Sequence, residues 1–432
     1  HLSVIGKITV VKSIILPVMV HLFVSLPNPD SSFLKSLEQL LFKFIWNNKN
    51  DRVSRNLLVQ HYGDGGLMMT HLSSFVSSLK VKWIRRLLFD HAPWIGLFPN
   101  LFSSKVPASS DRIVLYGPDY LKTLIRSTNN FFWKDVLSAL HSFRSLQLSN
   151  FNGLSIDLEP LWFSDKIYVG GNSIYYEKWA RAGINFVEQM IKEGQFITYT
   201  DFCDQFFPVD FTVFYGLKNS ILKAKLVGNR PPLTFPHCPQ YVLYFLKPKN
   251  SQIYRSFLKS VNYRTSYQLK WEVELGETIN AKHWKTINTV VNFPHDTKLR
   301  WFQYRLIHRI LSTKSFLYKI KLSDSDLCSY CNKEPETLYH LFIQCEIVTD
   351  FRKQLYEHFS PLPDSLLMNS VAIFSSSSKQ HITLLLLLLN FFIYRQKFTG
   401  VLSNELFIKY IKERSKHESN SEIYNSVIAM CN

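Results

Sequence analysis

Residues 328–345 read Cys-Ser-Tyr-Cys-Asn-Lys-Glu-Pro-Glu-Thr-Leu-Tyr-His-Leu-Phe-Ile-Gln-Cys, and this stretch decides how the C-terminal part of the chain folds. Cys328 and Cys331 can share one tight turn, so that their two thiolates hold one side of a tetrahedral metal ion. His340 and Cys345 can complete the coordination shell from a short helix. Four protein ligands leave no open coordination position, so the spacing predicts a structural Zn²⁺ site. The alternative is a chance grouping of buried cysteines with a core histidine.

The other cysteines show no such grouping. The chain has six cysteines in 432 residues, and Cys203, Cys238 and Cys431 are scattered along it. Six cysteines are too few for a disulfide scaffold in a chain of this length. We therefore expect a reducing compartment and a single metal site.

A basic and aromatic stretch lies just upstream of the cysteines. Residues 297–323 contain no Asp or Glu but hold seven basic side chains, which are Lys298, Arg300, Arg305, Arg309, Lys314, Lys319 and Lys321. On a helix, one face would carry Lys298, Trp301, Arg305, His308 and Arg309, and the opposite face would carry Leu306, Ile307 and Ile310 toward a core.

Basic groups interleaved with aromatic rings are typical of surfaces that bind phosphates and stack bases. The rings in this stretch are Trp301, Tyr304, Phe316 and Tyr318. The sequence therefore predicts a nucleic-acid-binding set of Lys298, Arg300, Trp301, Arg305, His308, Arg309 and Lys314. An ordinary solvated charged face is the alternative.

The whole chain is basic. It has 50 Lys and Arg against 33 Asp and Glu, which gives a formal charge of +17 and a pI near 9.4. Such a surplus suits a polyanionic partner, because each neutralised phosphate releases condensed counterions. Charge alone leaves open a membrane surface or no specific partner. The apolar content of 46% and aromatic content of 15% indicate a folded protein.

Two N-terminal segments show the 3.6-residue period of amphipathic helices. In residues 33–46 the apolar positions are Leu34, Leu37, Leu40, Leu41, Phe44 and Ile45. In residues 71–89 a stripe is predicted to face a core, and it consists of Leu72, Phe75, Val76, Leu79, Trp83 and Leu87. The opposite face carries Ser74, Ser78, Lys82 and Arg85, of which Lys82 and Arg85 are further candidate nucleic-acid-binding residues.

Strand-like alternation is sparse, so we predict a mainly α fold: a multi-part helical chain with a small C-terminal Cys-Cys-His-Cys zinc knuckle. Three consecutive regions are expected, namely 1–100, 101–295 and 296–432. The best candidate linker is residues 229–239, which contain four prolines. The chain starts at His1 without an initiator Met, so we expect a piece of a longer protein.

Residues 382–394 form an apolar run that could be mistaken for a membrane span. The run is only 13 residues long, it contains Thr383 and Asn390, and Arg395 ends it. A spanning helix needs about 20 apolar residues, so we predict a buried core helix. No secretory apolar region is recognised at the start of the chain. We therefore expect no membrane partner.

Motifs for covalent chemistry are missing from the sequence. No two acidic residues adjoin to form the Asp-Asp doublet with which a polymerase holds two Mg²⁺ ions. There is no P-loop, no His-Glu-x-x-His and no Gly-x-Ser-x-Gly. The glycine cluster at 63–66 is a turn, since no Lys-Ser/Thr follows it. We predict that this chain has no catalytic residues and is not an enzyme by itself.

Several stretches occur in an order that is typical of one protein family. They are Gly6–Pro17, Leu26-Pro27, Phe42–Asn47, Gly65–Leu67, Trp83–Arg86, Glu159–Trp162, Trp179, Gly183-Ile184, Thr297–Leu311, the cysteine knuckle and Phe392–Arg395. Together they resemble the region after the polymerase palm in LINE-type non-LTR retrotransposon reverse transcriptases. Thr70 departs from the family, whose members usually have proline there.

This resemblance implies a thumb-like region at 1–100, a helical wrist at 101–295 and a C-terminal nucleic-acid-binding domain at 296–432. It implies that Cys328, Cys331, His340 and Cys345 occupy the family's zinc positions. It also implies target-primed reverse transcription as the parent activity, with polymerase and endonuclease domains upstream in the same polyprotein. Because the palm and the endonuclease are missing from this chain, their activities are not carried over to it.

The expected role is therefore to hold template RNA and primer–template duplex, and to bind element RNA, without catalysis. The expected locations are a cytoplasmic ribonucleoprotein and the nucleus. The alternative is a domesticated or decayed retroelement fragment that acts as a structural or protein-interaction module. RNA affinity that falls steeply with salt would favour the first role, and no RNA binding at low salt would favour the second.

Overall fold

The computed structural model shows a mainly helical protein, as predicted. The residues that it describes are 2–103, 108–150, 159–192, 195–224, 250–261, 263, 265–358, 369–416 and 421–430. They form two compact units. The first is His1–Leu16, Ser36–Thr70 and Asn262–Asn432, and the second is Pro17–Lys35 and His71–Val261. These units do not follow the three consecutive regions of the sequence prediction, and the candidate linker 229–239 lies outside the described residues.

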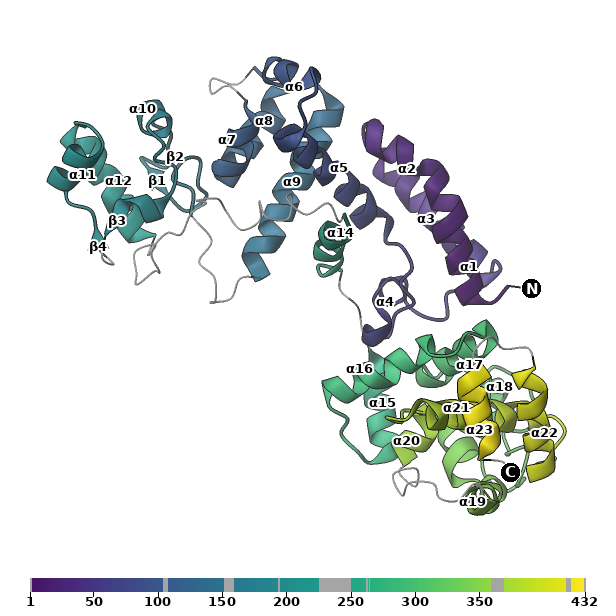
Figure 1. Cartoon of the computed structure of the whole chain (residues 1–432). Helices are drawn as coiled ribbons and strands as arrows, with labels where there is room; N and C mark the ends of the chain where they lie inside the picture. Colours follow the sequence, from purple (N-terminus) through teal and green to yellow (C-terminus); the bar gives the residue numbers. More distant parts are fainter. Residues whose placement is uncertain are drawn as a thin grey trace. The chain divides into compact units, whose positions relative to one another are not determined.

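The first unit combines segments from both ends of the chain (Figure 1). Its elements are α1 (Val4–Val10), η1 (Val11–Ile15), most of α3 (Ser31–Trp46), α4 (Arg55–Leu58), η2 (Tyr62–Asp64), α15 (Ser266–Leu275), α16 (Ala281–Thr289), η6 (Val290–Asn292), α17 (Thr297–Ile307), α18 (Lys314–Lys319), η7 (His340–Gln344), α19 (Glu346–His358), α20 (Asn369–Phe374), α21 (Gln380–Gln396), α22 (Asn404–Ser415) and α23 (Ser421–Ala429).

The second unit is helical with two short hairpins. Its elements are α2 (Leu16–Ser25), the start of α3, α5 (Leu72–Phe89), α6 (Trp94–Leu97), η3 (Phe98–Leu101), α7 (Ser110–Leu115), α8 (Pro118–Ser127), α9 (Phe131–Asn150), β1 (Tyr168–Val169), β2 (Asn172–Ser173), α10 (Glu177–Arg181), η4 (Val187–Met190), β3 (Ile191–Lys192), β4 (Gln195–Phe196), α11 (Tyr199–Gln205), α12 (Phe211–Lys223) and α14 (Asn250–Leu258). Both hairpins are antiparallel, with Tyr168 opposite Ser173 and Ile191 opposite Phe196.

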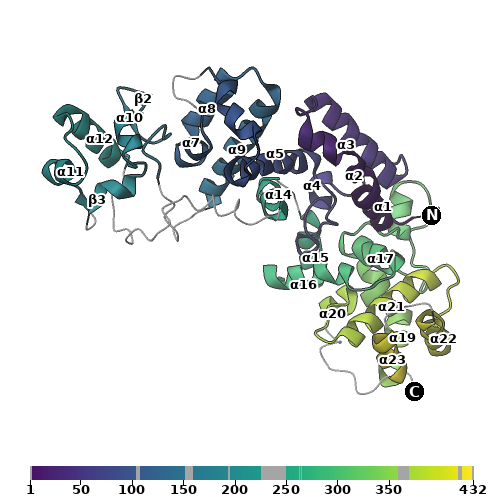
Figure 2. The same cartoon turned by 45° about the horizontal axis from the view of Figure 1, so that its top comes forward.

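Helix α21 is the core helix of the first unit. It packs against α17, α20, α22 and α23, and the two views of Figures 1 and 2 show it inside this bundle. Leu384 to Leu389 are all buried. The prediction of a core helix at 382–394 is therefore confirmed. Asn390, the polar interruption, is buried too, and its amide donates to the carbonyl oxygens of Ala372 at 2.9 Å and Ile373 at 3.2 Å. Its carbonyl accepts from Arg352, so the polar group is satisfied.

Helix α5 carries its predicted apolar stripe, but its opposite face differs from the prediction. Ser74 and Ser78 are buried and not solvent-facing. Helix α14 packs on α5, and the Asn250 amide donates to Ser78 Oγ at 3.2 Å. Lys80 is also buried, and its ammonium donates to the carbonyl oxygen of Leu26. Sequence periodicity missed this second contact because the partner helix lies about 170 residues away in the chain.

A continuous helical run from Val4 to Ser25 is long and apolar enough to cross a membrane by length and composition alone. Only 22% of its most apolar window is buried. Core helices of soluble proteins and signal sequences can have the same composition. The sequence reasoning weighed only residues 382–394 and missed this run. The expectation of no membrane partner therefore stays an untested prediction.

Candidate metal centre

Three thiols and one imidazole meet in the first unit. One ligand atom from each of Cys328, Cys331, His340 and Cys345 lies within 4.8 Å of the other three. The Sγ atoms of Cys328 and Cys345 are 3.9 Å apart, and Cys331 Sγ lies 3.3 Å from His340 Nε2. Cys328, His340 and Cys345 are buried, and Cys331 is partly buried. The structure thus brings all four predicted ligands together.

The local backbone explains how the two halves of the cluster meet. Cys328 N–H donates to the Glu334 carbonyl at 2.8 Å, and an antiparallel bridge joins Leu327 to Pro335. The turn closes at Asn332, whose φ of 54° lies in the left-handed region that Asn tolerates better than most residues. His340 begins η7, a single π-helical turn, and Cys345 N–H donates back to the His340 carbonyl at 2.8 Å. That turn carries the histidine and the last cysteine to the same point.

The surroundings of Cys328 favour its thiolate. A hydrogen bond from Cys345 lowers the pKa of Cys328 to about 5, and backbone N–H groups of Cys331 and Tyr330 add to this shift against the opposing effect of burial. A thiolate is the form of cysteine that binds a metal ion. The site is therefore electrostatically prepared for a cation.

The ligand spacing fits zinc. Zn–S bonds of about 2.3 Å and Zn–N bonds of about 2.0 Å in a tetrahedron separate neighbouring ligand atoms by about 3.5–3.8 Å. The distances of 3.9 Å and 3.3 Å lie close to that range. They are far longer than the 2.05 Å, or about that, of a disulfide. Four protein ligands fill the tetrahedron, so Zn²⁺ here would organise the fold and would not activate water.

Residues 264–351 match a protein-family model described as zinc-binding in reverse transcriptase. This part of the chain is a reverse transcriptase-associated zinc-binding domain. The match includes all four metal-binding side chains, so geometry and family agree on zinc as the cofactor, as the sequence predicted. The domain is an accessory one and not a catalytic one.

A buried carboxylate supports the zinc domain from outside the metal shell. Glu336 accepts hydrogen bonds from Ser329 Oγ at 2.7 Å, from the backbone N–H of Lys314 at 2.9 Å and from the Lys397 ammonium at 2.8 Å. Both charged side chains are almost fully buried, at 0% and 3% exposure for Glu336 and Lys397. Burial alone would raise the pKa of Glu336, but the Lys397 ammonium and these hydrogen bonds hold the pKa below its usual value. The pair is therefore ionised and satisfied.

Helix α21 supplies the remaining anchors of the knuckle. Tyr330 O–H, next to the second cysteine, donates to the carbonyl of Ile393 at 2.6 Å. The Lys397 ammonium and Tyr394 O–H both donate to the carbonyl of Ser312, at 2.8 Å and 3.1 Å. Sequence reasoning missed Glu336, Lys397 and Tyr330. No local pattern could have found the ion pair, because its members are 61 residues apart.

Helix α17 does not present the basic face that the sequence predicts. Lys298 is exposed in its first turn, but Trp301 and Arg305 are partly buried and His308 is buried. The prediction of an accessible contact is therefore wrong for His308. Its ring lies between Tyr304 and Tyr267, with ring centroids 4.0 Å and 4.3 Å away.

The arginines at either end of α17 make contacts within the unit. Arg300 donates to the carbonyl of Val291 at 3.2 Å and to Tyr62 Oη at 3.0 Å. The helix ends at Ile307, and Arg309 follows it with a left-handed φ of 59°, so Arg309 does not share the helical face. Its guanidinium forms a two-pronged ion pair with Glu274 at 2.7 Å and 2.5 Å. This ion pair competes with the phosphate contact that the sequence predicts for Arg309.

The other predicted nucleic-acid residues are placed differently. Lys314 begins α18 and is partly exposed. In the second unit, Lys82 is exposed and Arg85 is partly buried on α5. Their contact with nucleic acid stays a prediction.

The first prediction from this site concerns the metal. Cys331→Ser should remove zinc and unfold the segment from about Leu327 to Glu346, because the binding energy of a structural zinc site is largely folding energy. Cys203→Ser removes a partly buried free cysteine of the second unit and is the matched control, which should keep its zinc. Elemental analysis gives the ratio of zinc to chain. Purified wild-type protein with well under one zinc per chain would contradict the assignment.

The second prediction concerns acid stability. Burial lowers the pKa of His308 from 6.5 to about 3. Above pH 6.5 the ring is neutral in both folded and unfolded chains, whereas below it only the unfolded chain gains the proton, so stability falls as the pH drops. Between pH 7.5 and 5.5 the wild type should lose about 1 kcal/mol more stability than His308→Phe. Urea denaturation at both pH values measures this. Equal losses in the two proteins would show that the ring does not stay neutral.

Proposed function

We propose that this chain is a nucleic-acid-binding accessory part of a LINE-type retrotransposon reverse transcriptase. In this role it holds template RNA and primer–template duplex during target-primed reverse transcription, and it works beside polymerase and endonuclease domains of the same polyprotein. A cytoplasmic ribonucleoprotein and the nucleus are the corresponding locations. The family match of the zinc domain and the net charge of +17 support this proposal.

One surface of the zinc domain carries the argument. It consists of Lys314, Phe316, Tyr318, Lys319 and Lys321, and we call it the α18 surface. Phe316 and Tyr318 are each 51% exposed, and Lys319 and Lys321 are fully exposed. No acidic residue occurs between 297 and 323. Large rings left in water beside uncompensated cations are more typical of a binding surface than of a solvated helix.

The chemistry of the α18 surface fits single-stranded nucleic acid. Ammonium groups bind backbone phosphates without regard to sequence, and exposed rings stack on any base. Such contacts position a strand but do not read it. They suit a protein that must hold a moving template.

The zinc domain also fixes where the α18 surface lies. The backbone N–H of Lys314, in the first turn of α18, donates to Glu336. Thr313 caps the helix through its hydroxyl, and Leu322 N–H donates to the Leu317 carbonyl at 2.9 Å where the helix ends. The surface is therefore tied to the knuckle at its start and closed locally at its end.

The third prediction tests this surface by salt dependence. The double variant Lys319→Gln and Lys321→Gln should lower the slope of log affinity against log salt by about 1.4 for a single-stranded RNA oligomer, since each lost phosphate contact removes about 0.7. The matched control is Lys409→Gln and Lys412→Gln on α22, where Glu405 and Glu413 lie among the lysines. The control should change the slope much less. Fluorescence anisotropy at several salt concentrations measures both.

Two outcomes would contradict the proposal. An unchanged slope in the α18 double variant would move binding away from this surface. A wild-type protein that binds no RNA even at low salt would favour the structural or protein-interaction module instead.

We propose in addition that the chain does not polymerise nucleotides by itself. Two-metal nucleotide addition needs paired carboxylates around the incoming phosphate, and the sequence holds no Asp-Asp doublet. The fourth prediction is that the purified chain extends no primer on a homopolymer template with Mg²⁺ or Mn²⁺. Incorporation above a no-enzyme blank that a single Asp or Glu substitution abolishes would overturn it.

A further inference from the structure

Two buried hydrogen-bond donors of the first unit have no acceptor among the described residues. They are Nε1 of Trp46, at the end of α3, and Nε of Arg305, on α17. Trp46 is only 5% exposed. A buried donor without an acceptor costs about 1–3 kcal/mol, so native proteins keep few of them and many mark functional positions.

Both donors belong to side chains that contact the same ring. The ring centroids of Trp46 and Trp301 are 6.0 Å apart, and the Arg305 guanidinium lies 5.8 Å from the Trp301 ring centroid. Trp301 is itself stacked on Tyr304, with centroids 5.6 Å apart and planes 15° from parallel. The stack gives the two donors a rigid neighbour.

The charge around Arg305 is uncompensated. Burial is the largest cause that lowers the pKa of Arg305, and the guanidinium of Arg52 lowers it further. Within the described residues, neither arginine forms an ion pair with a carboxylate. The nearest acid in sequence, Asp51, is paired with Arg55 at 2.7 Å. A mostly buried arginine that faces a second arginine needs an anion to be stable.

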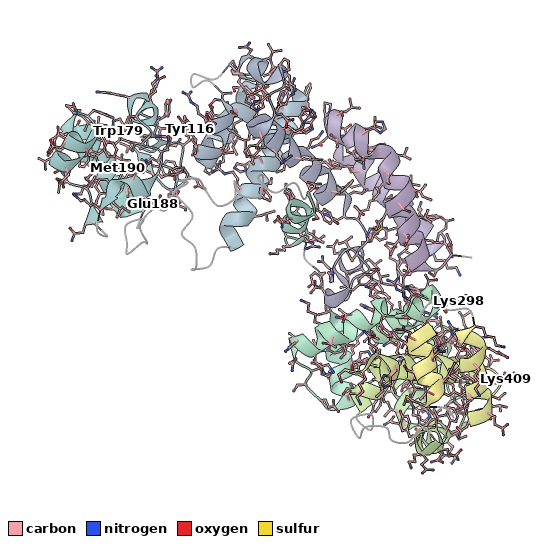
Figure 3. The ribbon with its side chains drawn as sticks, viewed as in Figure 1. Tyr116, Trp179, Glu188, Met190, Lys298 and Lys409 are labelled. Carbon is pink, nitrogen blue, oxygen red and sulfur yellow. The ribbon has the colours of Figure 1, made fainter. Side chains whose placement is uncertain are left out.

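A phosphate group meets all of these requirements. It carries negative charge for two guanidinium groups, which favour phosphate by their planar, forked geometry. It also has further oxygens that can accept from a neutral indole N–H. Lys298 lies on the same helical face as Trp301 and Arg305 and is exposed (Figure 3), so it extends the positive surface along α17.

We propose that Trp46, Arg52 and Arg305 bind a phosphate group of a nucleic-acid backbone beside the ring of Trp301. This inference rests on the proposed function and adds to it a site that is separate in composition from the α18 surface. It also gives Trp46 a role as a neutral donor to phosphate and not only as a core side chain.

The test uses the full chain and a fluorescent single-stranded RNA oligomer, with zinc content measured for each variant as a check of folding. Arg305→Gln and Arg52→Gln should each weaken binding about tenfold, as the loss of a charged hydrogen-bond partner does. Each should also lower the salt slope by about 0.7. Lys409→Gln removes one exposed positive charge from α22 (Figure 3) and is the matched control, which should change both quantities much less.

Trp46→Phe distinguishes a ligand contact from a purely structural role. It removes the indole N–H but no charge, so it should weaken RNA binding a few-fold. The salt slope should stay that of the wild type. If Trp46→Phe and Arg305→Gln bind RNA like Lys409→Gln, the site is refuted even though the wild type binds RNA. If the wild type itself binds no RNA, the proposed function fails first.

Inorganic phosphate separates the two sources of the phosphate group. The expected result is that millimolar phosphate competes only weakly with the RNA oligomer, because a single anion lacks the neighbouring contacts of a strand. If inorganic phosphate raises the melting temperature of the wild type but not of Arg305→Gln, while both bind RNA equally, the site binds a small anion. That result would overturn the nucleic-acid assignment.

Discussion

The structure of the zinc domain depends on one buried carboxylate. Glu336 receives hydrogen bonds from the knuckle through Ser329, from the start of α18 through the backbone of Lys314, and from the core helix α21 through Lys397. A buried charge of this kind is tolerated only when every lone pair is satisfied, so the three elements are held in one arrangement. The metal organises the knuckle from inside, and Glu336 fixes the knuckle to the helical body.

Two parts of the structure could be predicted from the sequence because their causes are local. The zinc ligands lie within 18 residues of one another, and ligand chemistry restricts their spacing. The apolar run of α21 could only be a core helix or a span, and its length excluded the span. The structure confirms both, and the mainly helical fold with them.

The remainder depends on contacts that no local pattern records. Ser74 and Ser78 look solvent-facing by periodicity, yet α14 covers them from far along the chain. Arg309 looks like part of a basic helical face, yet the helix ends before it and Glu274 engages its guanidinium. Trp46 and Arg305 are about 260 residues apart in sequence and meet only through Trp301. Periodicity gives the faces of single helices but not the partners that cover them.

The account joins zinc to nucleic acid through the position of α18. If the knuckle holds Glu336 and Glu336 holds the start of α18, then removing the metal should disorganise the α18 surface without any change in sequence. The direct measurement is the affinity of one RNA oligomer for the zinc-loaded chain, for the same chain stripped by a chelator, and for the stripped chain after Zn²⁺ is returned. The account predicts a large loss on stripping and recovery on reloading. Equal affinity in a chain shown by elemental analysis to have lost its zinc would contradict it.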